Sequence, residues 1–187
     1  ELVHGHSFFY FFFTAKNIDI NQANKNGCSP LYIACEKGHA AAVNALLEMD
    51  SIDINQSRVD GITPLLIACT KGHSLVVKAL IQMKEKNLQM NAAEKKNGMT
   101  PLYVASQNKD IKIVQLLLTL QNLQVNQTEK HGGSTALYIA CQNGSFEIVQ
   151  LLVEREDLDV NQPTKEGLSP LFIGTQKGFL NIVRILL

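Results

Sequence analysis

One seven-residue motif recurs five times along this chain at nearly constant intervals. The copies read SPLYIAC, TPLLIAC, TPLYVAS, TALYIAC and SPLFIGT, and they begin at Ser29, Thr63, Thr100, Thr135 and Ser169. Successive copies start 34, 37, 35 and 34 residues apart, and a Gly stands two residues before each copy. A fixed period of this length is typical of a chain that stacks copies of one small structural unit, so the repeat constrains the fold more than any other feature.

Each motif carries the residues expected at the start of a helix. Its Ser or Thr hydroxyl can accept a hydrogen bond from the free N–H groups of the first helical turn. Pro follows in every copy except at Ala136, and it occupies a position where a missing N–H costs nothing. The next residues are almost wholly apolar, and a turn glycine then predicts the end of the helix in four copies, at Gly38, Gly72, Gly144 and Gly178.

A second helix is predicted after each of these turns. Apolar residues recur there at i, i+3 and i+4 spacing, as in Val76 and Val77 with Leu80 and Ile81, which indicates one buried helix face. A helix pair of this size cannot bury its apolar face alone, whereas stacked pairs form a continuous core. We therefore predict an all-α solenoid of stacked helix-turn-helix units with hairpin-like connecting loops.

The alternation of turn, helix and helix, with TPL at the helix start, resembles the ankyrin repeat family. The resemblance extends over nearly the whole chain, so we expect a single array over residues 1–187. Its expected parts are a partial N-terminal repeat at 1–26, full repeats at 27–60, 61–97, 98–132 and 133–166, and a truncated C-terminal repeat at 167–187.

The chain departs from the family pattern at two kinds of position. The His that usually follows TPL is absent, and its place is taken by Tyr32, Leu66, Tyr103, Tyr138 and Phe172. We expect aromatic packing between neighbouring repeats to replace the polar link of that His, apart from what a Tyr hydroxyl supplies. Lys109 and Asp110 stand where other repeats have Gly followed by His, Ser or Phe. Because a left-handed backbone strains a residue with a Cβ, we expect this repeat to be the least regular.

The charge balance limits the classes of partner that we expect, and the cysteines indicate the cellular compartment. Lys and Arg together number 17, as do Asp and Glu, so electrostatics give no reason to expect a nucleic-acid partner. The four cysteines include no CxxC pair, which favours reduced thiols and a cytoplasmic location.

Candidate catalytic and metal-binding residues have a structural explanation in the repeat. Cys35, Cys69 and Cys141 occupy one small-residue position that Ser106 and Thr175 fill elsewhere, and no acid–base partner recurs beside it. We therefore expect packing cysteines, no catalytic residue and no small-molecule substrate.

The repeated histidines also have a structural explanation. His39 and His73 follow helix-ending glycines without further ligands in the repeat, so no metal or other cofactor is expected. The alternative is a zinc cluster that joins His4 and His6 to Cys28.

An Asn recurs in each connecting loop, in the sequences DIN, QMN, QVN and DVN. Asn55 and Asn126 also match the glycosylation pattern, but we interpret them as structural because the repeated turn needs them. The family resemblance additionally implies candidate substrates of an asparaginyl hydroxylase at Asn21, Asn55, Asn126 and Asn161.

Ankyrin arrays usually bind other proteins through the loop tips and the concave surface of the first helices, so the resemblance implies a protein or peptide partner. The predicted tip contacts are Lys25, Cys28, Asp60, Ile62, Lys96, Met99, His131, Lys165 and Leu168. The predicted groove contacts are Glu36, Lys37, Thr70, Lys71, Gln107, Asn108, Gln142, Asn143, Gln176 and Lys177. A partly apolar line beside a polar, mildly basic groove suits an extended peptide or a helix face with some acidic groups.

The run FFYFFF at residues 8–13 leaves two alternatives open. It aligns with the second-helix position of a partial repeat, and a helix that is apolar all round is a buried one, so we expect further chain or a second copy to pack on Phe8–Phe13. Membrane association through this run is the other possibility, although six residues fall far short of the roughly 20 that span a bilayer.

The array could also recruit the substrate of a larger enzyme.

Overall fold

The computed structural model describes residues 18–83 and 87–187. These ranges contain ten helices in five consecutive pairs, namely α2 (Pro30–Lys37) and α3 (Ala40–Leu47), α4 (Pro64–Thr70) and α5 (Ser74–Gln82), α6 (Pro101–Gln107) and α7 (Ile111–Leu118), α8 (Ala136–Gln142) and α9 (Phe146–Val153), α10 (Pro170–Gln176) and α11 (Leu180–Leu186). The predicted all-α fold of stacked helix-turn-helix units is confirmed. The aromatic run Phe8–Phe13 and the histidines His4 and His6 lie outside the described residues.

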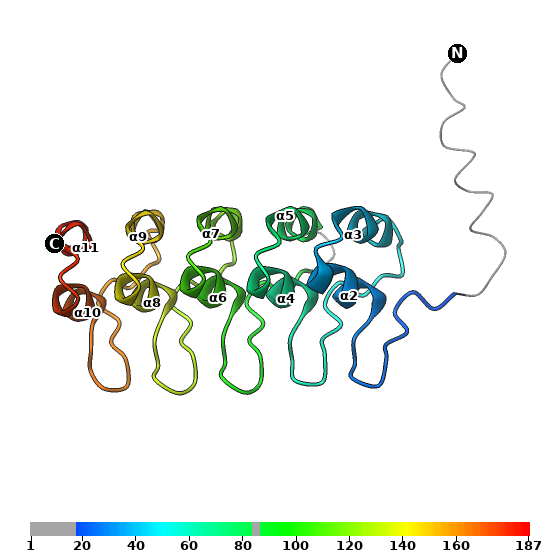
Figure 1. Cartoon of the computed structure of the whole chain (residues 1–187), viewed down its shortest axis with the longest axis horizontal. Coiled ribbons are helices and arrows are strands. Elements are labelled where there is room, and N and C mark those ends of the chain that lie inside the picture. Colours follow the sequence, from blue (N-terminus) through cyan, green and yellow to red (C-terminus); the bar gives the residue numbers. More distant parts are fainter. Residues whose placement is uncertain (1–17, 84–86) are drawn as a thin grey trace, which may run out of the picture.

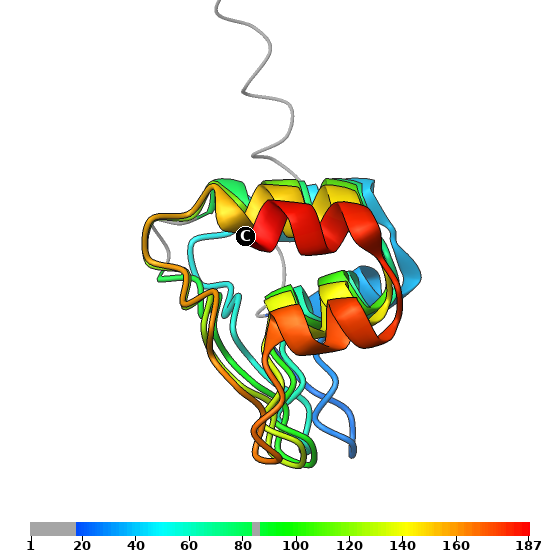
Figure 2. The same cartoon turned by 90° about the vertical axis from the view of Figure 1, so that its left-hand side faces the viewer.

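The helices form two parallel rows, which Figure 1 shows from the side. The first helix of every pair (α2, α4, α6, α8, α10) lies in one row, called the inner row, and the second helices (α3, α5, α7, α9, α11) lie in the outer row. Each helix contacts its pair partner and the helix of the same row in the next unit. Seen end-on, the connecting loops hang from one end of the inner helices, and the turn to the outer helix lies at the other end (Figure 2).

The Ser or Thr of each motif caps its inner helix as predicted. In all five units the hydroxyl oxygen accepts a hydrogen bond from the backbone N–H three residues later, at 3.1–3.2 Å. Ala136 therefore changes little, because Thr135 still supplies the cap.

The core lies between the two rows and continues from one unit to the next. The motif leucines Leu31, Leu102 and Leu137 are at most 2% exposed, and they pack with outer-row residues such as Ile113 and Ile148, which are fully buried. Because each unit supplies only two short helices, most of this burial depends on the neighbouring unit.

The turn between the two helices of a pair needs a left-handed backbone. Gly38 and Gly144 have φ values of 73° and 70°. Space also favours Gly there, because a Cβ on Gly38 would lie 2.6 Å from Nδ1 of His73, and one on Gly144 would lie 2.7 Å from Cζ of Phe179. The His73 ring also bonds the Glu36 carbonyl at 3.1 Å, which supports the structural role expected of this histidine.

Lys109 adopts the left-handed conformation in place of Gly, with φ of 60°. The expectation that its repeat is the least regular is wrong for the helices, since α6 and α7 match α8 and α9 in length. The left-handed backbone is confined to the turn residue Lys109, so the helices on either side keep their length. Asp110 adds a cap to α7, because its Oδ1 accepts a hydrogen bond from Ile113 N at 3.1 Å. The Lys109 ammonium in addition donates to the Asn143 carbonyl at 2.9 Å.

The repeated Asn of the connecting loop joins each unit to the next. Asn91 Nδ2 donates to the Asn122 carbonyl at 2.8 Å, and Asn91 Oδ1 accepts from Gln124 N at 2.9 Å. The same two bonds, at 2.7–2.9 Å, hold the loops that follow Asn21, Asn55 and Asn126. The structural interpretation of these Asn residues is thus confirmed.

We expect Asn126→Ala to lower the free energy of unfolding by about 2 kcal/mol, because it removes two hydrogen bonds between units. Asn161 is the matched control: it occupies the equivalent loop position, and within the described residues its side chain bonds no neighbour. Asn161→Ala should change stability by less than about 0.5 kcal/mol. Urea unfolding followed by circular dichroism measures both, and equal losses would contradict the role assigned to the Asn bonds.

Lys109→Gly should be more stable than Lys109→Ala by about 1 kcal/mol, because only Gly adopts the left-handed conformation without a steric penalty. Both variants lose the hydrogen bond from the Lys109 ammonium to the Asn143 carbonyl. The difference between their free energies of unfolding therefore reports only the backbone conformation at this position. The same urea titration measures it, and an Ala variant as stable as the Gly variant would show that the backbone at this turn is unstrained.

Candidate functional site

The tip of each connecting loop is a small hairpin, called a finger from here on. The fingers are residues 24–28, 58–62, 94–99, 129–134 and 164–168, and each is closed by a backbone hydrogen bond of 2.9–3.2 Å from its first residue to the carbonyl of its last. The third and fourth fingers contain one residue more than the others. Figure 1 shows the five fingers side by side along one edge of the array.

In these two longer fingers a glutamate accommodates the extra residue. Glu94 accepts hydrogen bonds from the backbone N–H groups of Lys96 and Asn97, and Glu129 accepts from the N–H groups of His131 and Ser134. Burial alone raises the pKa of Glu129, but these bonds outweigh it and hold the pKa below its usual value. The carboxylate therefore stabilises the finger and is not directed at a partner.

Arg58 and Asp60 form an ion pair in the second finger. The hydrogen bond from Arg58 is the main reason that the pKa of Asp60 is lowered. The Arg58 guanidinium also lies 5.9 Å from the centre of the Tyr32 ring, in the preceding unit. Asp60 was predicted as a tip contact, and its carboxylate is already paired within the finger.

The tyrosines that replace the family His are buried, with Tyr32 at 0%, Tyr103 at 7% and Tyr138 at 6% exposed. Tyr103 still supplies a polar link, because its hydroxyl lies 3.3 Å from Oγ of Ser134 in the next unit. Phe172 is 48% exposed in the last pair of described helices.

Neighbouring fingers are joined by backbone hydrogen bonds. Lys95 N donates to the Asp60 carbonyl at 2.8 Å, and equivalent bonds run from Val59, Lys130 and Lys165 to the preceding finger at 2.7–3.2 Å. Lys95 and Lys130 are therefore the counterparts of Lys165, although counting back from each Gly selected Lys96 and His131. The extra residue in the longer fingers shifts the count from Gly by one, and sequence reasoning did not single out Lys95 and Lys130 for this reason.

The predicted tip residues, called the tip row, remain accessible to a partner. Lys25, Lys96, His131 and Lys165 are exposed, whereas Cys28, Asp60, Ile62, Met99 and Leu168 are partly buried. Cys28, Ile62 and Leu168 pack partly on the core with one side. The tip row thus offers charge at its edge and partly covered apolar groups beside it.

The predicted groove residues, called the groove row, lie at the far ends of the inner helices. Lys37, Thr70, Lys71, Gln107, Asn108, Gln176 and Lys177 are exposed, and Glu36, Gln142 and Asn143 are partly buried. Two members also link units: Asn108 Nδ2 donates to the Thr70 carbonyl at 3.2 Å, and Asn143 Nδ2 donates to the Gln107 carbonyl at 3.1 Å.

The two rows border one face of the inner helices. The fingers hang from the start of each inner helix, and the groove row lies next to the turn at the opposite end (Figure 2). The inner-helix surface between the rows, together with the fingers, makes an L-shaped cross-section that repeats in every unit. A partner that lies along the array can therefore contact several units at once.

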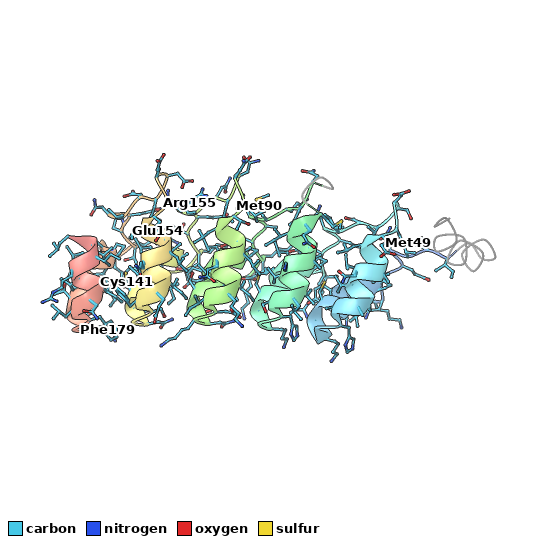
Figure 3. All side chains as sticks on the ribbon, turned by 90° about the horizontal axis from the view of Figure 1, so that it is seen from above. Met49, Met90, Cys141, Glu154, Arg155 and Phe179 are labelled. Carbon is cyan, nitrogen blue, oxygen red and sulfur yellow. The ribbon has the colours of Figure 1, made fainter. Side chains whose placement is uncertain are left out.

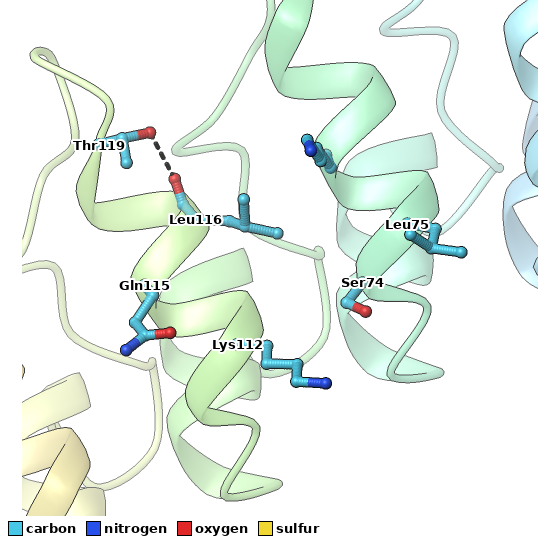
Figure 4. Close-up of a pocket in the computed structure, with 7 residues that line it drawn as sticks. Ser74, Leu75, Lys112, Gln115, Leu116 and Thr119 are labelled. Carbon is cyan, nitrogen blue, oxygen red and sulfur yellow. Dashed lines mark hydrogen bonds between the residues drawn. The ribbon is translucent and has the colours of Figure 1, made fainter.

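The outer row carries a different surface. An open hollow of about 350 Å³ lies between α5 and α7 and is lined by Leu75, Lys78, Lys112 and Leu116 among others. Figure 4 shows Lys112 and Leu116 directed from α7 toward α5. These lysines lie on the opposite side of the helix layer from the fingers, so they serve as controls for charge changes on the inner face.

The far end of the outer helices is held by a further link between units. Arg155, at the end of α9 in Figure 3, donates through Nη1 to the Leu118 carbonyl at 3.4 Å and pairs with Asp157. The Arg155 side chain thus ties the end of α9 to the end of α7.

Two further properties concern the described residues only. In these ranges, no three His, Cys, Asp or Glu side chains lie close enough together to hold a metal ion. No described helix is long and apolar enough to cross a membrane.

Comparison with protein-family models supports the repeat interpretation. A model described as ankyrin repeats (3 copies) matches residues 50–129 and 119–187, and a model described as ankyrin repeat matches residues 26–58. No catalytic domain was detected. No curated protein matches the sequence. The family matches together include all ten described helices.

We expect a thiol reagent at pH 8 to modify Cys28 rapidly in the folded chain and to leave the other three cysteines unmodified. Burial raises the pKa of Cys35 and of Cys141 to about 12 and also raises that of Cys69, so almost none of their thiols is in the reactive thiolate form at pH 8. Colorimetric thiol titration should give one fast thiol when folded and four in urea. Fast reaction of two or more thiols in the folded chain would contradict this packing.

Proposed function

Because the chain belongs to the ankyrin repeat family, we propose that it binds a partner protein or peptide, without catalysis, through the tip row and the groove row. Ankyrin repeats are in general protein–protein interaction modules. The choice of surface for this chain is our inference from the position and exposure of its own residues.

One observation carries the proposal. Most side chains of the two borders of the inner-helix face differ from unit to unit and are accessible, while most positions that recur are buried or bonded between units. The helix cap at Thr100 and the loop residue Asn91 illustrate the second class. A scaffold with a constant interior and a variable accessible border is suited to binding one specific partner.

The chemistry of the border indicates the kind of partner. The groove row contains Lys37, Lys71 and Lys177 with amides between them, and the tip row contributes partly exposed Ile62, Met99 and Leu168, all in described parts of the chain. A partner with a few apolar anchors and some carboxylates complements this surface. The extended length of the array favours an elongated segment of the partner over a compact protrusion of a folded domain.

We expect affinity purification from a cell lysate to recover a partner with the natural chain and to lose it with Lys37→Glu/Lys71→Glu. The double substitution reverses two charges in the groove row and should weaken binding about tenfold or more through repulsion of the partner's carboxylates. Quantitative mass spectrometry of the captured proteins measures the difference.

The matched control is Lys78→Glu/Lys112→Glu, which makes the same charge change on the outer face. It should retain the partner. The rate at which a thiol reagent modifies Cys28 is a second, direct measurement. A partner bound on the tip row should slow the modification of this thiol. An unchanged set of captured proteins with the groove variant would refute the surface that we propose.

A further inference from the structure

We propose that Lys95, Lys130 and Lys165, called the lysine ladder, form a site for an acidic polyproline II segment of a partner protein. This inference rests on the proposed function and specifies the partner's chemistry and conformation. The three lysines are equivalent by their backbone bonds to the preceding finger, and all three are exposed.

Each ladder lysine is held in place by the finger before it. Lys95 Nζ donates to the Val59 carbonyl at 2.9 Å, Lys130 Nζ donates to the Lys95 carbonyl at 2.6 Å, and Lys165 Nζ donates to the Lys130 carbonyl. The aliphatic stems lie over glycines, since a Cβ on Gly61 or Gly133 would meet the Cγ of the next ladder lysine at 3.0 Å. The ammonium groups are thus ordered before any partner arrives.

The ladder retains binding capacity. An ammonium group has three N–H donors, and the bond to the preceding carbonyl uses one of them. Among the described residues, ion pairs join only Arg58 to Asp60 and Arg155 to Asp157, so none of the three ladder ammonium groups is neutralised. The neighbouring carboxylates of Glu94 and Glu129 are occupied by backbone N–H groups of their own fingers.

The spacing of the ladder selects the conformation of its ligand. Adjacent packed helices lie about 8–10 Å apart. Each unit also contributes one finger, and a backbone hydrogen bond joins it to the finger before it. Because one unit adds one helix to each row, equivalent ammonium groups recur about every 8–10 Å along the array.

A polyproline II helix rises about 3.1 Å per residue with three residues per turn, so every third side chain faces the same way about 9 Å further on. A β-strand offers same-face side chains at about 7 or 13 Å, and neither spacing matches. An α-helix repeats a face about every 10.5 Å over seven residues, but helices dock through an apolar stripe, whereas the ladder presents ammonium groups. An acidic residue at every third position of a polyproline II segment fits the ladder best.

The test uses the 187-residue chain and a fluorescent peptide with five Glu-Pro-Pro units. Fluorescence anisotropy at low salt should show saturable binding, and Lys95→Gln/Lys130→Gln/Lys165→Gln should bind about tenfold more weakly. Glutamine keeps part of the stem over the glycine and removes the charge. The control Lys78→Gln/Lys112→Gln/Arg184→Gln removes three charges from the outer row and should bind like the natural chain.

Two matched changes test the spacing. A peptide with five Glu-Pro-Pro-Pro units has the same charge, but its carboxylates fall out of register, so it should bind several-fold more weakly. Val59 is the uncharged counterpart of the ladder lysines and is 65% exposed, and its Cγ1 lies 3.4 Å from a Cβ built on Gly27. Val59→Lys should extend the ladder by one step and tighten binding about two- to threefold.

Equal binding of both peptides, an unaffected triple variant, or tighter binding of a 15-nucleotide oligo-dT would each overturn the ladder site, the last by showing a nucleic-acid surface. Circular dichroism confirms that every variant is folded. The peptide tests can contradict the ladder site while the Lys37→Glu/Lys71→Glu variant still loses its lysate partner. In that case the proposed function stands. Conversely, a lysate partner that is insensitive to the groove variant refutes the proposed surface even if the peptide binds.

Discussion

Everything in this array depends on contact between neighbouring units. A pair of seven- to nine-residue helices has too little apolar surface to remain folded alone, and helices this short are marginal in water. Leu31, Leu102 and Leu137 are at most 2% exposed in the stacked array, where each inner helix contacts its pair partner and the neighbouring inner helices. The hydrophobic contact between units is thus the condition under which each helix, each finger and each surface row exists.

Polar bonds between units then fix how the pairs are placed on one another. Most of them lie in three lines along the array: the Asn bonds of the connecting loops, the bonds between fingers, and the links at the far ends of the inner helices from His73, Asn108 and Asn143. Hydrophobic contact is not directional, whereas these bonds require one register. They hold the accessible side chains at a constant repeat distance, and both proposed binding modes need that regularity.

The fold could be predicted almost completely from the sequence, and the candidate site only in outline. Helix caps and turn glycines act over three or four residues, so the Ser29 cap and the turn at Gly38 were predictable from local pattern. Lys109 shows the limit of that approach: its left-handed backbone was foreseen, but the strain stays within that turn and the helices of its repeat keep their length. At the tips, counting from Gly chose Lys96 where the bonds between fingers make Lys95 the equivalent residue.

The sequence by itself determined the period, the helix pairs and the family, because each unit repeats the same local signals and each signal acts within a few residues. Tertiary structure alone decided which side chains remain accessible and unpaired on the surface that we propose for binding. Asp60 is paired by Arg58, Asn108 bonds the preceding helix, and the ladder lysines are aligned by glycines of the finger before them. Arg58 and Asp60 are close in the sequence, whereas the residues of the other contacts are more than 30 positions apart. Only the stacking of units brings such distant residues into contact.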